Sequence, residues 1–135
     1  VIESLNGRVL FHGIRVKPGM PTMLSVVEDI PVLSLSGNPF AVAALFELLA
    51  GGYLADRAEE VYTQKKEIKV LRQTFVKTGK PKRIVKGKCD EEGVFLPQIQ
   101  RNGQLKNGIG SNCLVVFPEG ERTYPEGEKV QVIRI

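Results

Sequence analysis

Two short loops hold the residues of this sequence that could bind or transform a ligand. The loop KPGMP, Lys17 to Pro21, begins with a lysine that two prolines and a glycine follow, and the loop SGNP, Ser36 to Pro39, precedes an apolar segment. The first turn of a helix attracts anions through its amides and its dipole, and a lysine adds a full charge. We therefore expect one anion site, for a phosphate or a molybdate-like oxyanion. Its candidate residues are Lys17, Gly19, Ser36, Gly37, Asn38 and Pro39.

Each loop also has a purely structural explanation, and the residues alone leave both open. SGNP can be only a helix cap, and KPGMP only a tight turn. His12 could carry a proton near the site, although a lone histidine on a strand more often packs or lies at the surface. Glu28 and Asp29 are adjacent on a turn, which favours solvated side chains over an acid/base pair. The chain has a single histidine and no obvious nucleophile elbow, so we assemble no Ser/His/Asp set and assign no catalytic residue.

The elements expected to position these loops are strands over Val9–Val16, Thr22–Val27 and Pro31–Ser36, followed by one core helix. Asn38 is a strong N-cap, Pro39 suits the first helical position, and Gly51-Gly52 predicts the stop. The carboxyl ends of strands gather ligands in open α/β sheets. Residues 1–56 are thus expected to be the C-terminal part of an α/β domain, incomplete because so few elements cannot cover a parallel sheet.

After Arg57 the pattern changes to short alternating runs separated by turns. KEIKVLRQTFVK, KRIVKGKC, GVFLPQI, NCLVVF and KVQVIRI predict strands, and the turn sequences between them are GKPK, DEEG, RNGQ and PEGE, the last occurring twice. Several short strands at this spacing indicate a small all-β barrel, which we place over residues 62–135.

Composition narrows the function further. The 135 residues are 42% hydrophobic with a net charge of +4, as expected of a globular protein. The longest apolar run, Phe40 to Leu54, is shorter than the roughly 20 residues of a membrane span, and no leader is recognised at Val1, so we expect a cytoplasmic protein without a membrane partner. Cys89 and Cys113 are far apart and lack companion histidines, which predicts buried thiols, no metal site and no disulfide.

Positive charge is concentrated between Lys65 and Lys88, which contains ten of the nineteen Lys and Arg residues and one acid, Glu67. The segment could make the barrel a binding module for an acidic partner or for nucleic acid. Phe75 is the one aromatic residue within it, whereas proteins that bind single strands interleave rings with charge. Solvated strand faces are therefore favoured, and nucleic acid is not the expected partner.

KPGMP, PVLSLSGNPFAVAALFELL and the terminal block NGQLKNGIGSNCLVVFPEGERTYPEGEKVQVIRI together resemble the C-terminal part of the molybdopterin molybdenumtransferase family, which includes MoeA and the gephyrin E domain. The resemblance implies an α/β domain of molybdopterin-binding type followed by a β-barrel. It also implies insertion of molybdate into adenylylated molybdopterin with Mg²⁺, in a homodimer whose cleft uses other domains. This chain by itself is then expected to be catalytically inert.

Two departures from the family pattern bear on activity. Lys17 matches the first lysine of the family's KPGKP loop, but Met20 stands where the second lysine is expected. Ser36 to Pro39 match the family's PGNP loop, with Ser36 in place of its first proline. These changes remove a cation and a rigid ring, so a degenerate, non-catalytic paralogue is kept as an alternative hypothesis.

Overall fold

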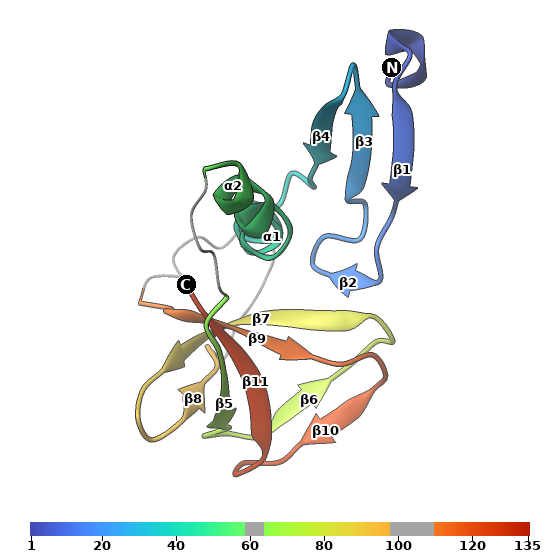
Figure 1. Ribbon diagram of the computed structural model, residues 1–135. Helices are drawn as coiled ribbons and strands as arrows, with labels where there is room; N and C mark the ends of the chain where they lie inside the picture. The colour runs from blue at the N-terminus through green and yellow to red at the C-terminus, as the bar shows by residue number, and fades with distance from the viewer. Residues whose placement is uncertain (59–63, 98–109) are drawn as a thin grey trace.

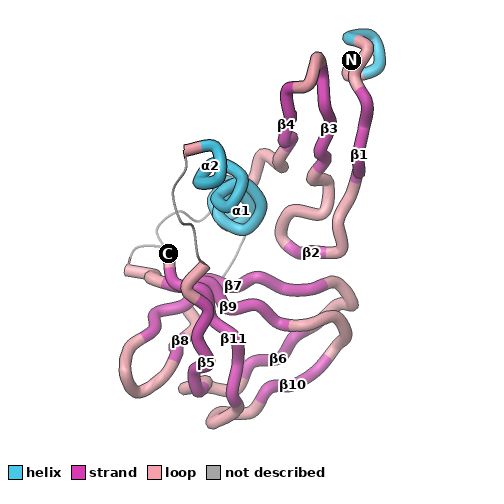
Figure 2. Tube along the Cα trace, viewed as in Figure 1, coloured by secondary structure: helices cyan, strands magenta, loops and turns pink. Residues whose placement is uncertain are grey.

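The computed structural model describes residues 1–58, 64–97 and 110–135 of the chain. Figure 1 shows a small N-terminal sheet, a helical segment beside it, and a larger region of strands that holds the C-terminus. The helical segment lies against the larger region, whereas the N-terminal sheet stands away from it (Figures 1 and 2). The turn expected at RNGQ, residues 101–104, lies outside the described residues.

The N-terminal sheet is antiparallel, with the strand order β1-β3-β4. It contains β1 (Arg8–His12), β3 (Met23–Val27) and β4 (Ile30–Ser34), after a short 3-10 turn η1 (Glu3–Leu5). Glu28 and Asp29 form the β3–β4 turn with φ of 49° and 65°, as a two-residue hairpin requires. The prediction of a parallel α/β sheet is wrong for these strands, because such a turn joins only antiparallel neighbours.

The single strand predicted over Val9–Val16 is divided in the structure. β1 ends at His12, and Gly13 adopts φ of +87°. A separate short strand, β2 (Val16–Lys17), follows. β2 then pairs in parallel with β7 (Lys82–Cys89) of the larger region. The segment that leads into KPGMP is therefore part of the C-terminal sheet.

The helical segment is longer than predicted. It runs through α1 (Pro39–Leu45), a π-helical stretch η2 (Phe46–Ala50) and α2 (Gly51–Arg57). Gly51 has φ of −54°, a right-handed value, so it continues the helix instead of ending it in the left-handed conformation of a C-cap. The helical segment Pro39–Arg57 has 19 residues, which by length and composition alone are enough to span a membrane. The apolar run considered in the sequence, Phe40 to Leu54, is shorter. In this helical segment, 17% of an 18-residue apolar stretch is buried in the protein.

The larger region contains the strands predicted from the short alternating runs. The main path has the order β2-β7-β9-β11-β5, β8 pairs with β7, and β6 pairs with β10 in a separate ladder. Among the described residues no closed barrel is formed, because the β6–β10 ladder is not joined to the main sheet. The bounds not yet given are β5 (Lys66–Val70), β6 (Phe75–Lys77), β8 (Val94–Phe95), β9 (Cys113–Phe117), β10 (Arg122–Tyr124) and β11 (Lys129–Arg134). β10 was not predicted, since three residues between two turns carry no periodicity.

Both faces of β7 are covered. Val85 belongs to the inner core of the strand region, where Phe117 stacks on Phe75 with ring centroids 4.5 Å apart. Ile84 faces the other way and packs with Ala44 and Leu45 of α1. This second cluster attaches the helix to the sheet and so fixes the position of the SGNP loop.

Candidate functional site

The KPGMP loop is closed by hydrogen bonds to its own backbone. Thr22, which is fully buried, donates its Oγ1 hydroxyl to the Gly19 carbonyl at 2.7 Å and its amide to the same oxygen at 3.1 Å. The Ile14 amide donates to the Met20 carbonyl at 2.9 Å. The loop contains a cis peptide between Lys17 and Pro18. It is therefore held in one conformation, as its two prolines suggest.

The KPGMP loop contacts the helix that SGNP begins. Gly19 is buried with φ of +114°, and a Cβ at this position would lie 2.2 Å from Leu45 Cδ1 of α1. Leu45 is itself 2% exposed. The absence of a side chain at Gly19 thus lets the KPGMP loop pack directly on the helix that SGNP begins. Leu45 lies six residues after Pro39, so this contact joins the KPGMP loop to the body of α1, and convergence of the two loops on one site stays a prediction.

The helix start itself offers fewer amides than we expected. Asn38 Oδ1 accepts hydrogen bonds from the amides of Phe40 at 3.0 Å and Ala41 at 3.1 Å. The Val42 amide donates to the Asn38 carbonyl at 3.0 Å, and Pro39 has no amide hydrogen. The expectation that first-turn amides are free for an oxyanion is wrong, because the cap that starts the helix uses them.

Ser36 and Gly37 keep the polar and open character that a ligand site needs. The Ser36 hydroxyl oxygen is buried and has no hydrogen-bond partner among the described residues. Gly37 is exposed, and a Cβ there would meet nothing within 4 Å. Packing therefore does not require glycine at position 37, and the Ser36 hydroxyl could donate to a bound group.

Lys17 does not lie where the sequence argument put it. It pairs with Arg83 across β2 and β7, and paired residues point to the same side of a sheet. The preceding residue, Val16, packs in the α1 cluster with Ile84, so the Lys17 Cβ starts on the opposite face of the strand. The side chain is exposed, and only its length can bring its ammonium round to the helix start.

Sequence reasoning did not assign to the site a cation that lies beside the helix start. Lys86 Nζ lies 4.8 Å from the centroid of the Phe40 ring, two residues after the Asn38 cap. In KRIVKGKC, Ile84 and Lys86 alternate onto the face that packs on α1. The alternation is visible in the sequence. The sequence does not show that this face of β7 packs on α1, because α1 lies more than 35 residues earlier in the chain.

The basic run does not form one continuous charged face. Lys69 and Arg72 are engaged with acids, Lys69 with Glu67 at 3.5 Å and Arg72 with Glu92 at 3.0 Å. Lys77 is 1% exposed, and its ammonium donates to the carbonyls of Gly79 and Gly120. Neighbouring basic residues of β7 leave the strand on opposite faces.

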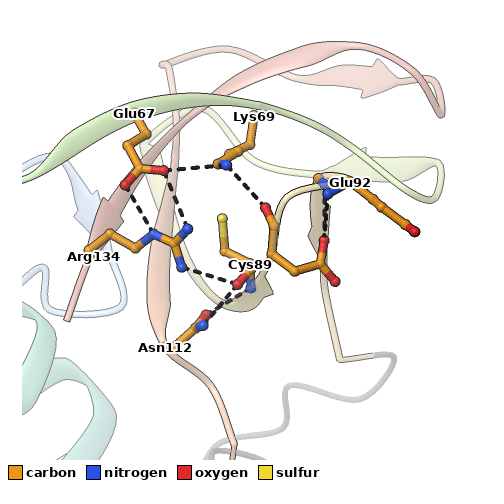
Figure 3. Close-up of polar contacts among 8 residues, drawn as sticks. Glu67, Lys69, Cys89, Glu92, Asn112 and Arg134 are labelled. Atoms are coloured by element: carbon orange, nitrogen blue, oxygen red, sulfur yellow. Dashed lines mark hydrogen bonds and ion pairs between the residues drawn. The ribbon is translucent and has the colours of Figure 1, made fainter.

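A second polar cluster, drawn in Figure 3, joins the ends of β5, β7 and β11. Arg134 Nε donates to Glu67 Oε1 at 3.1 Å, and Arg134 NH1 donates to the Cys89 carbonyl at 3.1 Å. Asn112 closes the cluster with a pair of hydrogen bonds to the backbone of Cys89. The hydrogen bond from Arg134 lowers the pKa of Glu67. These groups satisfy one another and serve to hold the strands together.

The cysteines are buried and free, as predicted. Burial, with the neighbouring Cys89 thiol as a second cause, raises the pKa of Cys113 to about 12. His12 is exposed on β1. In the described part of the chain no three His, Cys, Asp or Glu side chains gather in a way that could hold a metal ion.

Comparison with known proteins relates this chain to the MoeA proteins. Residues 70–135 match the model of the MoeA C-terminal region, domain IV. They belong to the MoeA C-terminal domain family. The similarity to MoeA proteins extends over the rest of the chain as well. A putative molybdopterin biosynthesis protein of Methanocaldococcus jannaschii is 30% identical over 128 residues, which are 93% of this chain and 30% of the relative. The molybdopterin molybdenumtransferase of Bacillus subtilis is 26% identical and is matched by 100% of this chain and 33% of its own length.

Solved MoeA structures share the fold. The chain superposes on the molybdopterin biosynthesis MoeA protein of Pyrococcus horikoshii with a TM-score of 0.83 and 28% identity, covering 98% of this chain and 33% of that protein. A molybdenum cofactor biosynthesis protein of Pyrococcus furiosus gives a TM-score of 0.74 at 26% identity, covering 95% and 45%. The MoeA-like chain described here thus spans about a third of the length of the curated relatives it matches.

Proposed function

We propose that this chain supplies the C-terminal part of an enzyme that inserts molybdate into adenylylated molybdopterin. In this proposal KPGMP and SGNP form one wall of an anion-binding cleft, and the strand region supports them. The whole enzyme acts as a cytoplasmic homodimer, and the chain alone is inert. The support comes from relatives that are MoeA proteins and molybdopterin molybdenumtransferases about three times as long.

The observation that carries the proposal is the packing of Gly19 under Leu45. It holds the KPGMP loop against the helix that follows SGNP, which supports a common surface for two loops separated by 14 residues. On this surface the chemistry suits an oxyanion. Lys86 supplies charge at the helix start, and the Ser36 hydroxyl is a donor without a partner among the described residues. A buried hydroxyl gains free energy when a ligand oxygen accepts its hydrogen bond.

The roles within the site differ from those expected. Asn38 and Pro39 position the loop through the helix cap and do not offer helix amides to the anion. Gly37 leaves open space for a phosphate or molybdate oxygen. Lys86 acts as the near cation, whereas Lys17, whose Cβ starts on the other face of β2, contributes only longer-range attraction. Molybdate and the molybdopterin phosphate are bound as substrates by these groups.

The Mg²⁺ implied by the family has no fitting ligand set in the described part of this chain, because no three carboxylate, imidazole or thiolate groups converge there. Mg²⁺ prefers carboxylate and phosphate oxygens. We therefore assign the ion to none of these residues.

A chimera tests the proposal. The corresponding third of the Bacillus subtilis relative is replaced by residues 1–135 and expressed in a strain that lacks its molybdenumtransferase. We expect cofactor synthesis to be restored, and to fall at least about tenfold with Lys86→Ala, since a hydrogen bond or ion pair to a charged group contributes roughly 1.5–3 kcal/mol. Lys80→Ala, an exposed lysine outside the site, is the matched control. Full activity of the Lys86→Ala chimera would remove this lysine from the cleft.

Met20 supports the alternative of a non-catalytic paralogue. Its side chain is 49% exposed on the KPGMP loop, so it fills no core space there. A chimera that is inactive as such and gains cofactor synthesis with Met20→Lys would establish that this position silences the site. Activity without that change excludes the alternative. The other alternative is a basic β-barrel that binds an acidic partner or nucleic acid. It gains no comparable support, because the cations of the segment lie on different faces of the strands.

A further inference from the structure

A second concave site lies on the strand region, away from the SGNP loop. It has a volume of about 470 Å³, within the range of roughly 300–1,000 Å³ usual for small-molecule sites. Three segments distant in sequence form its walls: the residues that lead into β6, the middle of β7, and the end of β8. The lining residues that matter for the argument are Gln73, Thr74, Phe75, Arg83, Phe95 and Pro97.

Arg83 gives this cleft its charge. Its side chain is half-buried, yet its guanidinium forms no hydrogen bond or ion pair with any described residue. Other arginines of the chain are engaged: Arg15 with Glu119 at 3.4 Å and Arg122 with Glu128 at 2.7 Å. Lys17 pairs with Arg83 in the sheet and adds positive charge beside it. A half-buried guanidinium without an acid partner favours a carboxylate or phosphate that it can bind with two parallel hydrogen bonds.

The remaining walls are apolar and flat. Phe95 is 46% exposed although it is a large apolar residue, and it lines the cleft from β8, which pairs with the end of β7. Phe75 is fixed by stacking on Phe117 and also lines the cleft. Pro97 adds a third rigid apolar surface. Aromatic walls of this kind bind planar rings by offset or edge contacts.

Thr74 and Gln73 supply polar groups at the margin. The Gln73 side-chain oxygen accepts the Leu96 amide at 3.3 Å, which orients its NH₂ group as the remaining donor. Thr74 Oγ1 accepts the Glu126 amide at 3.3 Å and retains its own proton for donation. The cleft thus combines one cation, fixed hydrogen-bond donors and aromatic walls.

From this combination we propose that the cleft between β6, β7 and β8 binds a small planar aromatic molecule that carries a carboxylate or phosphate group, with Arg83 holding the anion. The site is distinct from the SGNP cleft, because Arg83 and Val85 leave β7 on the face opposite Ile84 and Lys86. Its occupation does not depend on the molybdopterin chemistry proposed above.

Backbone amide NMR titration of the 135-residue chain tests this site with four probes. These are 1-naphthyl phosphate, 2-naphthoate, the uncharged 2-naphthylmethanol and inorganic phosphate. We expect saturable shifts at Thr74, Arg83 and Phe95 with one or both of the aromatic anions, and binding at least about tenfold weaker for the two probes that lack either the ring or the charge. Whichever of the two anions binds more tightly identifies the group that Arg83 prefers.

The variants make the test specific. Arg83→Gln should weaken binding about tenfold or more. Lys82→Gln removes the same charge from the adjacent residue on the opposite face and should change it less than twofold. Phe95→Ser provides a second loss of affinity if Arg83→Gln proves poorly folded. Absence of saturable shifts, equal affinity of the Arg83→Gln variant, or shifts confined to Ser36–Pro39 would each overturn the proposal. Unchanged binding in Lys86→Ala separates this result from the fate of the proposed enzyme function.

Discussion

Gly19 lies directly beneath Leu45, and a Cβ on Gly19 would fall 2.2 Å from the Leu45 Cδ1 atom. This relationship joins the KPGMP loop to α1 and fixes the distance between the two loops of the candidate site. The φ of +114° at Gly19 adds a second requirement for glycine, because side chains rarely adopt that conformation.

Gly19→Ala should therefore destabilise the protein by about 1–3 kcal/mol, the usual cost of overpacking. Gly37→Ala is the matched control, since its Cβ would meet nothing within 4 Å and its stability should change by less than about 0.5 kcal/mol. Urea denaturation of both variants measures the difference. Adding Leu45→Ala to Gly19→Ala should recover part of the loss relative to additivity. Equal midpoints for Gly19→Ala and Gly37→Ala would contradict the packing argument.

Asn38→Asp separates the structural role of the cap from the binding role of the loop. Aspartate caps helices as well as asparagine does and is favoured by the helix dipole, so stability should stay within about 0.5 kcal/mol. A carboxylate at this position repels an oxyanion, so cofactor synthesis by the chimera should fall. Asn38→Ala, in contrast, should cost about 1 kcal/mol of stability. An active Asn38→Asp chimera would show that no anion approaches this residue.

Lys77 is a buried ammonium that ties together two loops through the carbonyls of Gly79 and Gly120. Lys77→Met keeps the length of the side chain but leaves both carbonyls without this donor, so we expect a loss of about 2–4 kcal/mol. Thermal and urea unfolding measure it. Lys80→Met, at an exposed position nearby, should change stability by less than about 0.5 kcal/mol. A loss shared equally by both variants would point to charge in general and not to these contacts.

Glu67 makes stability depend on pH in the acid range. The hydrogen bond from Arg134 lowers its pKa in the folded state below the ordinary value of 4.5. The folded protein therefore binds this proton less readily than the unfolded chain, and the stabilisation is present above the unfolded pKa and is lost as pH falls through the folded pKa. Glu67→Gln should flatten the pH dependence of the unfolding free energy below about pH 5. Its control is Glu91→Gln, an exposed position; an unchanged slope in Glu67→Gln would refute the assignment.

The local features of this protein are determined by its sequence. Asn38 and Pro39 specify where the helix begins, because capping depends on residues within one turn. Several predicted turns, such as those at Gly93, Gly120 and Gly127, contain glycines with positive φ, a conformation that needs no distant contact. The strands KRIVKGKC and KVQVIRI follow from their apolar residues in the same way. The resemblance to the MoeA family was also visible in the ordered motifs.

Tertiary structure alone decided how these parts come together. Gly51 keeps a right-handed φ of −54° and continues the helix, an outcome that the local Gly51-Gly52 signal does not predict. β2 joins the C-terminal sheet through pairing with β7, a partner more than 60 residues away. That pairing sets Lys17 beside Arg83, and the packing of α1 on β7 brings Lys86 to the helix start. Contacts between distant segments depend on the complementarity of whole surfaces, which single-sequence periodicity does not encode.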